Sequence, residues 1–310
     1  MSHGAFGLTW RTIVHTYWCD PKVNAKEASM KFAICNETFQ EGGQHWPMER
    51  VISYCAEIGY EGIEIAPFTL AASAYDVTPA RRAEIRSAAE KAAIQIVGFH
   101  WLLVAPPGLY VNHPDDAIRE KTEAYLRELV GLCADLGGEV MVFGSPKQRS
   151  VQDGWSTRKT WERTVEVFKR IADLAARRNV YLAVEPLTTK ETNFIVSLED
   201  GLDMVAAVGH DHCLLHLDVK AMAADARRSV ADTIRAEGGR CLRHFHANDP
   251  NLRGPGFGNE DFVPILRALS EIRYDRWVSV EVFDYSPDPQ TIATRSLEYL
   301  KKCQVEAARK

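Results

Sequence analysis

The sequence predicts a single (β/α)8 barrel, also called a TIM barrel, and three observations lead to it. Short apolar runs alternate with longer amphipathic segments eight times along the chain. Strands that alternate with helices form parallel sheets, and eight such units in 310 residues close into a barrel. No segment rich in proline, glycine and serine divides them. A doubly wound open sheet is the alternative, but it often has a glycine fingerprint after its first strand, where this chain has Asn36-Glu37-Thr38.

The predicted elements follow in order from Met30, where the regular pattern begins. Strands are expected after Met30 and over 62–67, 95–104, 139–143, 180–186, 213–218, 241–247 and 277–283. Helices are expected over 46–58, 78–93, 115–136, 157–178, 197–208, 227–237, 260–272 and 289–302. The third unit shows the reasoning, because Thr78 is a good N-cap and Pro79 fits the first helical position.

The first 29 residues differ from the rest of the chain. They contain no long apolar block and no small-residue cleavage site, so they are a poor secretory signal. We expect a disordered N-terminal extension over 1–29 and one barrel domain over 30–310.

Composition favours a small-molecule enzyme. The chain is 46% hydrophobic and 25% charged, which suffices for a large core. A net charge of -5 provides no basic excess for nucleic acid, and no apolar run reaches membrane-spanning length. The seven cysteines are dispersed without C-x-x-C spacing, which indicates buried thiols in a reducing compartment. We therefore expect a cytoplasmic protein that binds neither nucleic acid nor membrane.

Ionisable residues end the last four predicted strands. They are Glu185, Asp218, His246 and Glu281. Barrel enzymes carry their active sites at the carboxyl ends of strands, so these four side chains should converge. Their mixed oxygen and nitrogen donors suit Mn²⁺, Mg²⁺ or Co²⁺, and the absence of thiolates argues against a closed zinc site. His244 points to the same face as His246, one layer deeper, and is interpreted as a packing or supporting residue.

These four strand ends, in this order, resemble those of the sugar phosphate isomerase/epimerase superfamily, which has a xylose-isomerase-like barrel. The motifs are Val184-Glu185-Pro186, Leu217-Asp218, His244-Phe245-His246 and Val280-Glu281. The superfamily includes ketose 3-epimerases, hydroxypyruvate isomerases and inosose-processing enzymes. The resemblance covers Met30 to about Lys302 and implies one divalent metal ion, with Mn²⁺ expected and Mg²⁺, Co²⁺ or Zn²⁺ as alternatives. It also implies that Glu185 and Glu281 form an acid/base pair, and that such barrels often form homo-oligomers.

The resemblance also implies which residues bind the substrate. Glu191, six residues after Glu185, matches a substrate-binding glutamate of the 3-epimerases. Arg253 lies near their substrate-binding arginine, with the spacing from His246 longer by one residue. Where they have a substrate-contacting histidine three residues after the metal aspartate, this chain has Ala221, and Lys220 is the candidate replacement.

Other strand ends supply further pocket candidates. His100 and Trp101 follow the third strand, and Trp101 is expected to form an apolar wall for a sugar face. Glu37 and Glu64 are interpreted as ion partners behind the site. Lys147 and Arg149 form a second group of candidates. They suggest a phosphorylated or carboxylated substrate, but the preferred interpretation is a basic loop that faces solvent.

The predicted reaction starts from a metal-stabilised enediolate of a sugar or keto-polyol. Protonation of the same carbon from the opposite face gives epimerisation, and protonation of its neighbour gives isomerisation. Loss of a β leaving group gives a lyase or dehydratase, as on an inosose or a 3-keto-glycoside, and Ala221 keeps this alternative open. Nucleases share the barrel but need more histidines for several zinc ions, and a non-catalytic barrel would leave the four strand ends a coincidence.

Overall fold

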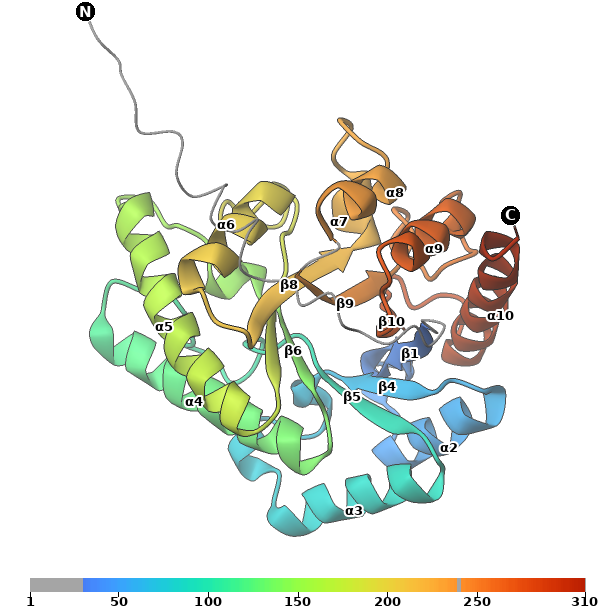
Figure 1. The fold of residues 1–310 in the computed structure, drawn as a ribbon. Helices are drawn as coiled ribbons and strands as arrows, with labels where there is room; N and C mark the ends of the chain where they lie inside the picture. The colour runs from blue at the N-terminus through green and yellow to red at the C-terminus, as the bar shows by residue number, and fades with distance from the viewer. Residues whose placement is uncertain (1–29, 239–240, 310) are drawn as a thin grey trace, which may run out of the picture.

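Eight parallel strands form a closed barrel, as predicted (Figure 1). The computed structural model describes residues 30–238 and 241–309. Neighbouring strands pair in chain order, and the last closes on the first through the register Phe32 to Val278. The barrel strands are β1 (Lys31–Cys35), β4 (Gly62–Ile65), β5 (Gln95–Phe99), β6 (Val140–Phe143), β7 (Tyr181–Val184), β8 (Cys213–Asp218), β9 (Leu242–Ala247) and β10 (Trp277–Val280).

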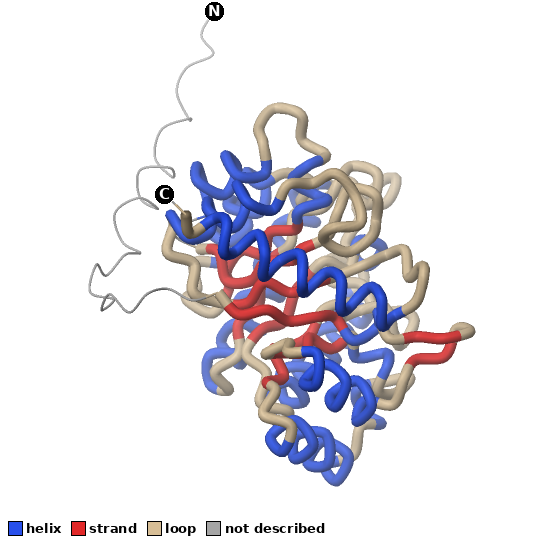
Figure 2. The backbone as a smooth tube through the Cα atoms, turned by 90° about the vertical axis from the view of Figure 1, so that its right-hand side faces the viewer, coloured by secondary structure: helices blue, strands red, loops and turns tan. Residues whose placement is uncertain are grey.

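Helices surround the strands, as Figure 2 shows with helices in blue and strands in red. Most begin at a polar side chain that accepts a backbone N–H, which satisfies one of the free donors at a helix start. Thr78, for example, accepts from the amide of Arg81. The longer helices are α2 (Met48–Ile58), α3 (Pro79–Lys91), α4 (Asp116–Asp135), α5 (Thr157–Arg177), α6 (Leu198–Val208), α9 (Phe262–Glu271) and α10 (Pro289–Ala307).

The helix predicted over 227–237 begins later, as α8 (Val230–Thr233), and continues as a π-helical segment, η5 (Ile234–Gly238). A further helix before it, α7 (Val219–Ala223), was not predicted. The reason is capping: Asp218 accepts from the amide of Ala221 at 2.7 Å and starts a helix directly at the strand end. Ser229 then starts a second one.

Smaller differences also separate prediction and structure. The strands expected over 95–104, 180–186 and 277–283 end earlier, at Phe99, Val184 and Val280, so that the residues beyond them form the barrel mouth. A two-stranded ribbon, β2 (Gln40–Glu41) with β3 (Gln44–His45), was not predicted and projects from the barrel (Figure 2). The expected extension over 1–29 lies outside the described residues.

The barrel interior is layered. Small and apolar side chains of alternate strand positions form a separate cluster at one end, comprising Ala33, Val97, Val140, Val142, Ala183 and Trp277. Two residues further along their strands the same face carries polar groups, such as Cys35 after Ala33 and Glu185 after Ala183. The larger apolar core lies between the strands and the helices. Within the described residues, no helix is long and apolar enough to cross a membrane.

Two glycines test the packing of this fold. At Gly98 in β5 a Cβ atom would lie 1.9 Å from the carbonyl oxygen of Val140, whereas at Gly131 in α4 it would meet nothing within 4 Å. Gly98→Ala is expected to lower the free energy of unfolding by about 1–3 kcal/mol through overpacking. Gly131→Ala should raise it by about 0.5–1 kcal/mol because alanine is the better helix former. Urea denaturation of both variants measures these effects, and a neutral Gly98→Ala would contradict the described strand pairing.

Candidate metal centre and barrel mouth

Four ionisable side chains meet at the carboxyl end of the barrel, as the sequence predicts. We call Glu185, Asp218, His246 and Glu281 the quartet. All four are buried, and one ligand atom from each lies within 4.8 Å of the others. The β8–β9 register places Asp218 beside His246, and His246 Nδ1 lies 3.1 Å from Glu281 Oε2. Three carboxylates and an imidazole at this spacing form a donor set for a hard or borderline divalent cation.

Glu185 is held in place through its backbone and by a neighbouring glycine. The guanidinium of Arg149 donates to the carbonyl oxygens of Glu185 at 2.8 Å and of Phe143 and Ile195 at 3.2 Å. A Cβ atom at Gly144 would lie 2.2 Å from Glu185 Oε2, so only glycine leaves room for this carboxylate.

Asp218 is fixed from two sides. One carboxylate oxygen accepts from the amide of Ala221, and the other accepts a short hydrogen bond from the Asn248 side-chain amide. Asn248 in turn accepts from the amide of Lys220 at 2.8 Å. The same contacts that start α7 therefore orient a member of the quartet.

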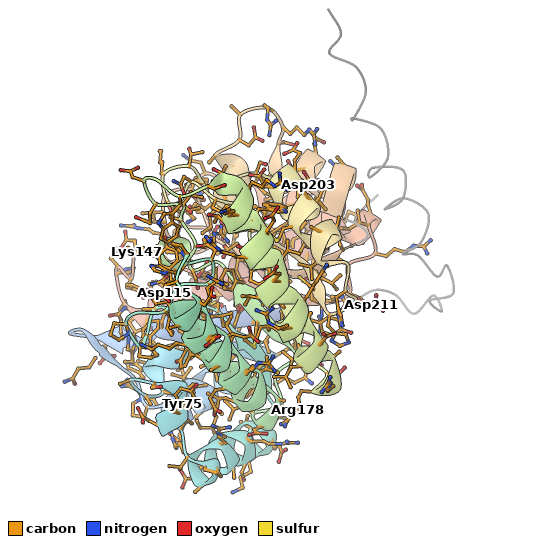
Figure 3. All side chains as sticks on the ribbon, turned by 90° about the vertical axis from the view of Figure 1, so that its left-hand side faces the viewer. Tyr75, Asp115, Lys147, Arg178, Asp203 and Asp211 are labelled. Carbon is orange, nitrogen blue, oxygen red and sulfur yellow. The ribbon has the colours of Figure 1, made fainter. Side chains whose placement is uncertain are left out.

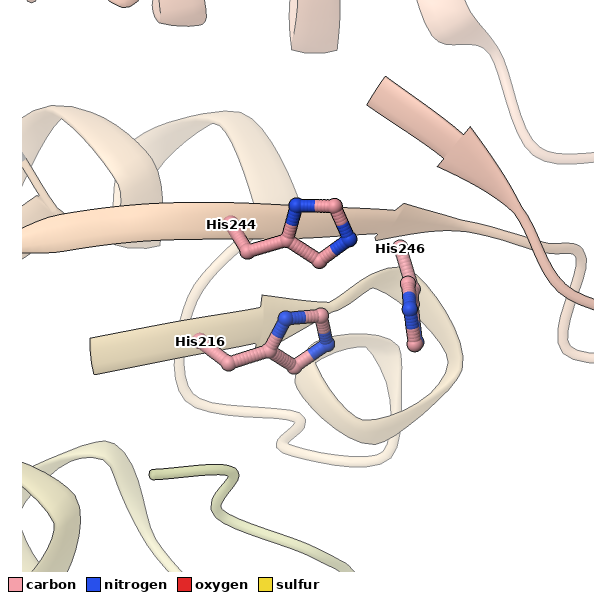
Figure 4. A group of neighbouring side chains, drawn as sticks. All are labelled: His216, His244 and His246. Carbon is pink, nitrogen blue, oxygen red and sulfur yellow. The ribbon is translucent and has the colours of Figure 1, made fainter. Parts of the chain in front are cut away.

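A buried glutamate lies beneath the quartet. Glu64 Oε2 lies 2.7 Å from His244 Nε2, and both of its oxygens lie 3.1 Å from His246 Nε2. His216, which the sequence analysis did not single out, packs against them, with its ring centroid 4.2 Å from that of His246 (Figure 4). His244 thus supports the site from below, as predicted. His216 could have been found from the sequence, because it lies two residues before Asp218 and alternate residues of a strand point to the same face.

The environment of the quartet disfavours the ionised form of two of its carboxylates. Burial, with Glu281 and Asp218 nearby, raises the pKa of Glu185 to about 8. Burial, together with Glu281, also raises the pKa of Asp218, although Lys220 opposes this. Burial also tends to raise the pKa of Glu281, but the nearby His246 outweighs this effect and lowers it below the usual value. A bound cation would relieve this repulsion, so these residues fit a divalent metal ion.

His100 lies beside the quartet and is fully buried. Its Nε2 is 2.9 Å from Glu37 Oε1, and its Nδ1 is 3.6 Å from Glu64 Oε1. Its ring centroid is 5.7 Å from that of His246. Glu37 and Glu64 therefore act as ion partners behind the site, in agreement with their interpretation from the sequence.

The mouth above the quartet is formed by residues of α7 and of three loops, those that follow β5, β7 and β10. Lys220 Nζ lies 2.7 Å from Glu191 Oε1 and 4.1 Å from the ring centroid of Phe283. Trp101 approaches the same phenylalanine, with ring centroids 6.3 Å apart. Burial disfavours the ammonium, but Asp218 and Glu191 outweigh it and raise the pKa of Lys220. The structure thus brings Lys220 and Trp101 together at Phe283, a residue that the sequence analysis did not name, and Glu191 joins this group through Lys220.

Arg253 stands apart from these residues. Its guanidinium contacts Asp284 Oδ2 at 2.8 Å and Ser286 Oγ at 3.1 Å, so it joins the loops that follow β9 and β10. Its side chain is 39% exposed.

The basic residues after β6 do not form one anion site. Lys147 is exposed on the surface (Figure 3), whereas Arg149 is fully buried and bonded to backbone carbonyls. Burial lowers the pKa of Arg149 to about 10. A solvated basic loop is therefore correct for Lys147 and wrong for Arg149.

The chain belongs to the family of xylose isomerase-like TIM barrels, whose model matches residues 52–303. Among characterised relatives, L-ribulose 3-epimerase of Mesorhizobium japonicum is 26% identical over 236 residues, 76% of this chain and 75% of that protein. Fructoselysine 3-epimerase of Escherichia coli O157:H7 is 25% identical over 270 residues, 84% of this chain and 94% of that protein. The superfamily suggested by the strand-end motifs is thereby confirmed.

Solved structures agree on the fold. A crystal structure of D-psicose 3-epimerase in the presence of D-fructose superposes with a TM-score of 0.77 at 22% identity, covering 89% of this chain and 99% of that chain. A 3-keto-D-glucoside 4-epimerase from E. coli gives a TM-score of 0.75 at 17% identity, with coverages of 89% and 100%.

The raised pKa of Glu185 predicts a pH-dependent stability of the metal-free protein. Between pH 4.5 and about 8 the unfolded chain ionises this residue while the folded one keeps it protonated, so its contribution to folding weakens as pH rises. Glu185→Gln imitates the protonated form. Urea denaturation in chelator should find the variant equal to the wild type near pH 4 and increasingly more stable toward pH 8. A constant difference across this range would contradict the account of a crowded, uncompensated quartet.

Proposed function

We propose that this protein is a divalent-metal-dependent epimerase of a keto-sugar or keto-polyol. The quartet is the observation that carries the proposal, because it places two glutamates, an aspartate and a histidine within ligand distance of one another at the barrel mouth. The relatives named as ketose 3-epimerases support the reaction class. Manganese is the expected ion because three of four donors are carboxylates.

The residues of the quartet would hold the ion, and Glu185 and Glu281 would also move protons. A divalent ion there would supply Lewis-acid stabilisation of negative charge on the carbonyl and hydroxyl oxygens of the substrate. One glutamate would remove the proton from the carbon next to the carbonyl, and the other, which starts protonated, would donate its own proton to the opposite face of that carbon. Their environments shift their pKa values in opposite directions, Glu281 down and Glu185 up, which is the pattern expected of a base and an acid.

Lys220 and Glu191 would bind substrate hydroxyl groups. The resemblance assigns Glu191 to the substrate, and Lys220, next to Ala221 at the position of the histidine in the 3-epimerases, forms an ion pair with that glutamate. The ammonium supplies hydrogen-bond donors and the carboxylate acceptors, so together they can bind vicinal hydroxyls. Trp101 and Phe283 offer an apolar wall to the sugar ring. His100 and Arg253 would contribute from beside the metal and from the rim.

Deuterium exchange separates epimerisation from its alternatives. The Mn²⁺-loaded protein is incubated in D₂O with L-ribulose, D-psicose or fructoselysine, and NMR follows the C–H beside the carbonyl. We expect deuterium at that carbon together with the epimeric product. Release of water or of a leaving group instead would identify a lyase or dehydratase and contradict the proposal.

The same assay tests the two glutamates. Glu185→Gln and Glu281→Gln should each lower turnover by about 10²–10⁴-fold, the usual contribution of a general acid or base. Glu162→Gln on the exposed face of α5 makes the same chemical change far from the mouth and should leave turnover unchanged.

A further inference from the structure

Glu64 is the most deeply buried carboxylate of the site. It comes from β4, yet its oxygens contact histidines of β9, a strand that is not its neighbour in the barrel. Its side chain is fully buried, and burying a carboxylate is costly unless its partners are well placed. The contact crosses the barrel interior directly beneath the quartet, so Glu64 bonds to the one nitrogen donor of that set.

We propose that Glu64 is a positioning residue that sets the tautomer and the ring orientation of His246, so that Nδ1 and not Nε2 binds the metal. The inference rests on the proposed metal site and goes beyond it, because it assigns the ligand atom. An ionised carboxylate can only accept hydrogen bonds. His246 must therefore carry its proton on Nε2, which lies 3.1 Å from both carboxylate oxygens.

The geometry on the other side of the ring agrees. A neutral imidazole with a proton on Nε2 has its lone pair on Nδ1. Nδ1 of His246 is the atom that lies 3.1 Å from Glu281 Oε2, inside the quartet. A carboxylate behind a ligating imidazole also makes it a stronger donor, as in other carboxylate–histidine–metal arrangements.

His244 secures the carboxylate itself. Its Nε2 lies 2.7 Å from Glu64 Oε2, the closest of these contacts, and both rings are fully buried. Glu64 thus accepts from two histidines of one strand at the same time. An amide at this position is uncharged and has a donor NH₂ in place of one oxygen, and this NH₂ would face the Nε2–H of His246. Glu64→Gln keeps the shape of the side chain but removes its charge and one of its two acceptor oxygens.

Cobalt binding tests the proposal without any substrate. In the full-length protein, Glu64→Gln should bind Co²⁺ about 10–100-fold more weakly than the wild type, the usual loss for such a partner, and should change the cobalt d–d absorption spectrum. Glu61→Gln, an exposed glutamate at the start of the same strand, makes the matched change and should leave both unchanged. Equal affinity and an equal spectrum for Glu64→Gln would overturn the proposal.

The wild-type protein gives a second measurement, which holds even where the variant does not fold. Long-range ¹H–¹⁵N NMR of the Zn²⁺-loaded protein reports which ring nitrogen of His246 is protonated and which binds metal. We expect a protonated Nε2 and a zinc-bound Nδ1, and the reverse assignment overturns the inference. A wild type that binds neither ion removes the metal site and this inference together, whereas normal binding with an unaffected Glu64→Gln removes this inference alone.

Discussion

The carboxyl end of this barrel is organised by the mutual repulsion of buried carboxylates. Glu185, Asp218 and Glu281 share a space that excludes most water, and only one member of the quartet is an imidazole. Burial and, after it, the neighbouring carboxylates raise the pKa values of Glu185 and Asp218. Such an arrangement is unfavourable by itself, and a bound cation would offset the repulsion.

The structure around the quartet is arranged in layers. Apolar side chains fill the lower barrel, and the histidines and Glu64 form the layer above them. The quartet lies over that layer, and α7 and the loops after the strands complete the mouth with Lys220, Glu191, Trp101 and Phe283. The strand ends thus position the groups proposed to hold the metal, while α7 and the loops carry the groups proposed to recognise the substrate.

The fold and the quartet could be predicted because both depend on short-range patterns. Alternation of strands and helices gives the barrel, and a strand's end identifies Asp218 or Glu281 without any knowledge of its neighbours. The contact of Glu64 with His244 depends on the barrel's closure, since 180 residues separate them. Arg149 reads as a solvated loop residue in the sequence, and only the packed structure shows it bonded to three carbonyls.

The helix after β8 illustrates a different limit. Asp218 was predicted as a metal ligand, but it also caps α7, a helix that the sequence analysis did not predict. A capping side chain and a ligand are the same residue type at the same kind of position, at a strand end followed by a turn. The structure shows the capping role because the carboxylate of Asp218 accepts from the amide of Ala221, and it shows the carboxylate oriented within the quartet by Asn248.

The most direct test of the central claim is a crystal structure of the Mn²⁺-loaded protein with anomalous scattering data. The account predicts one strong manganese peak per chain, bounded by Glu185, Asp218, His246 and Glu281. A quartet without metal at saturating Mn²⁺, or a manganese peak elsewhere in the barrel, would contradict it.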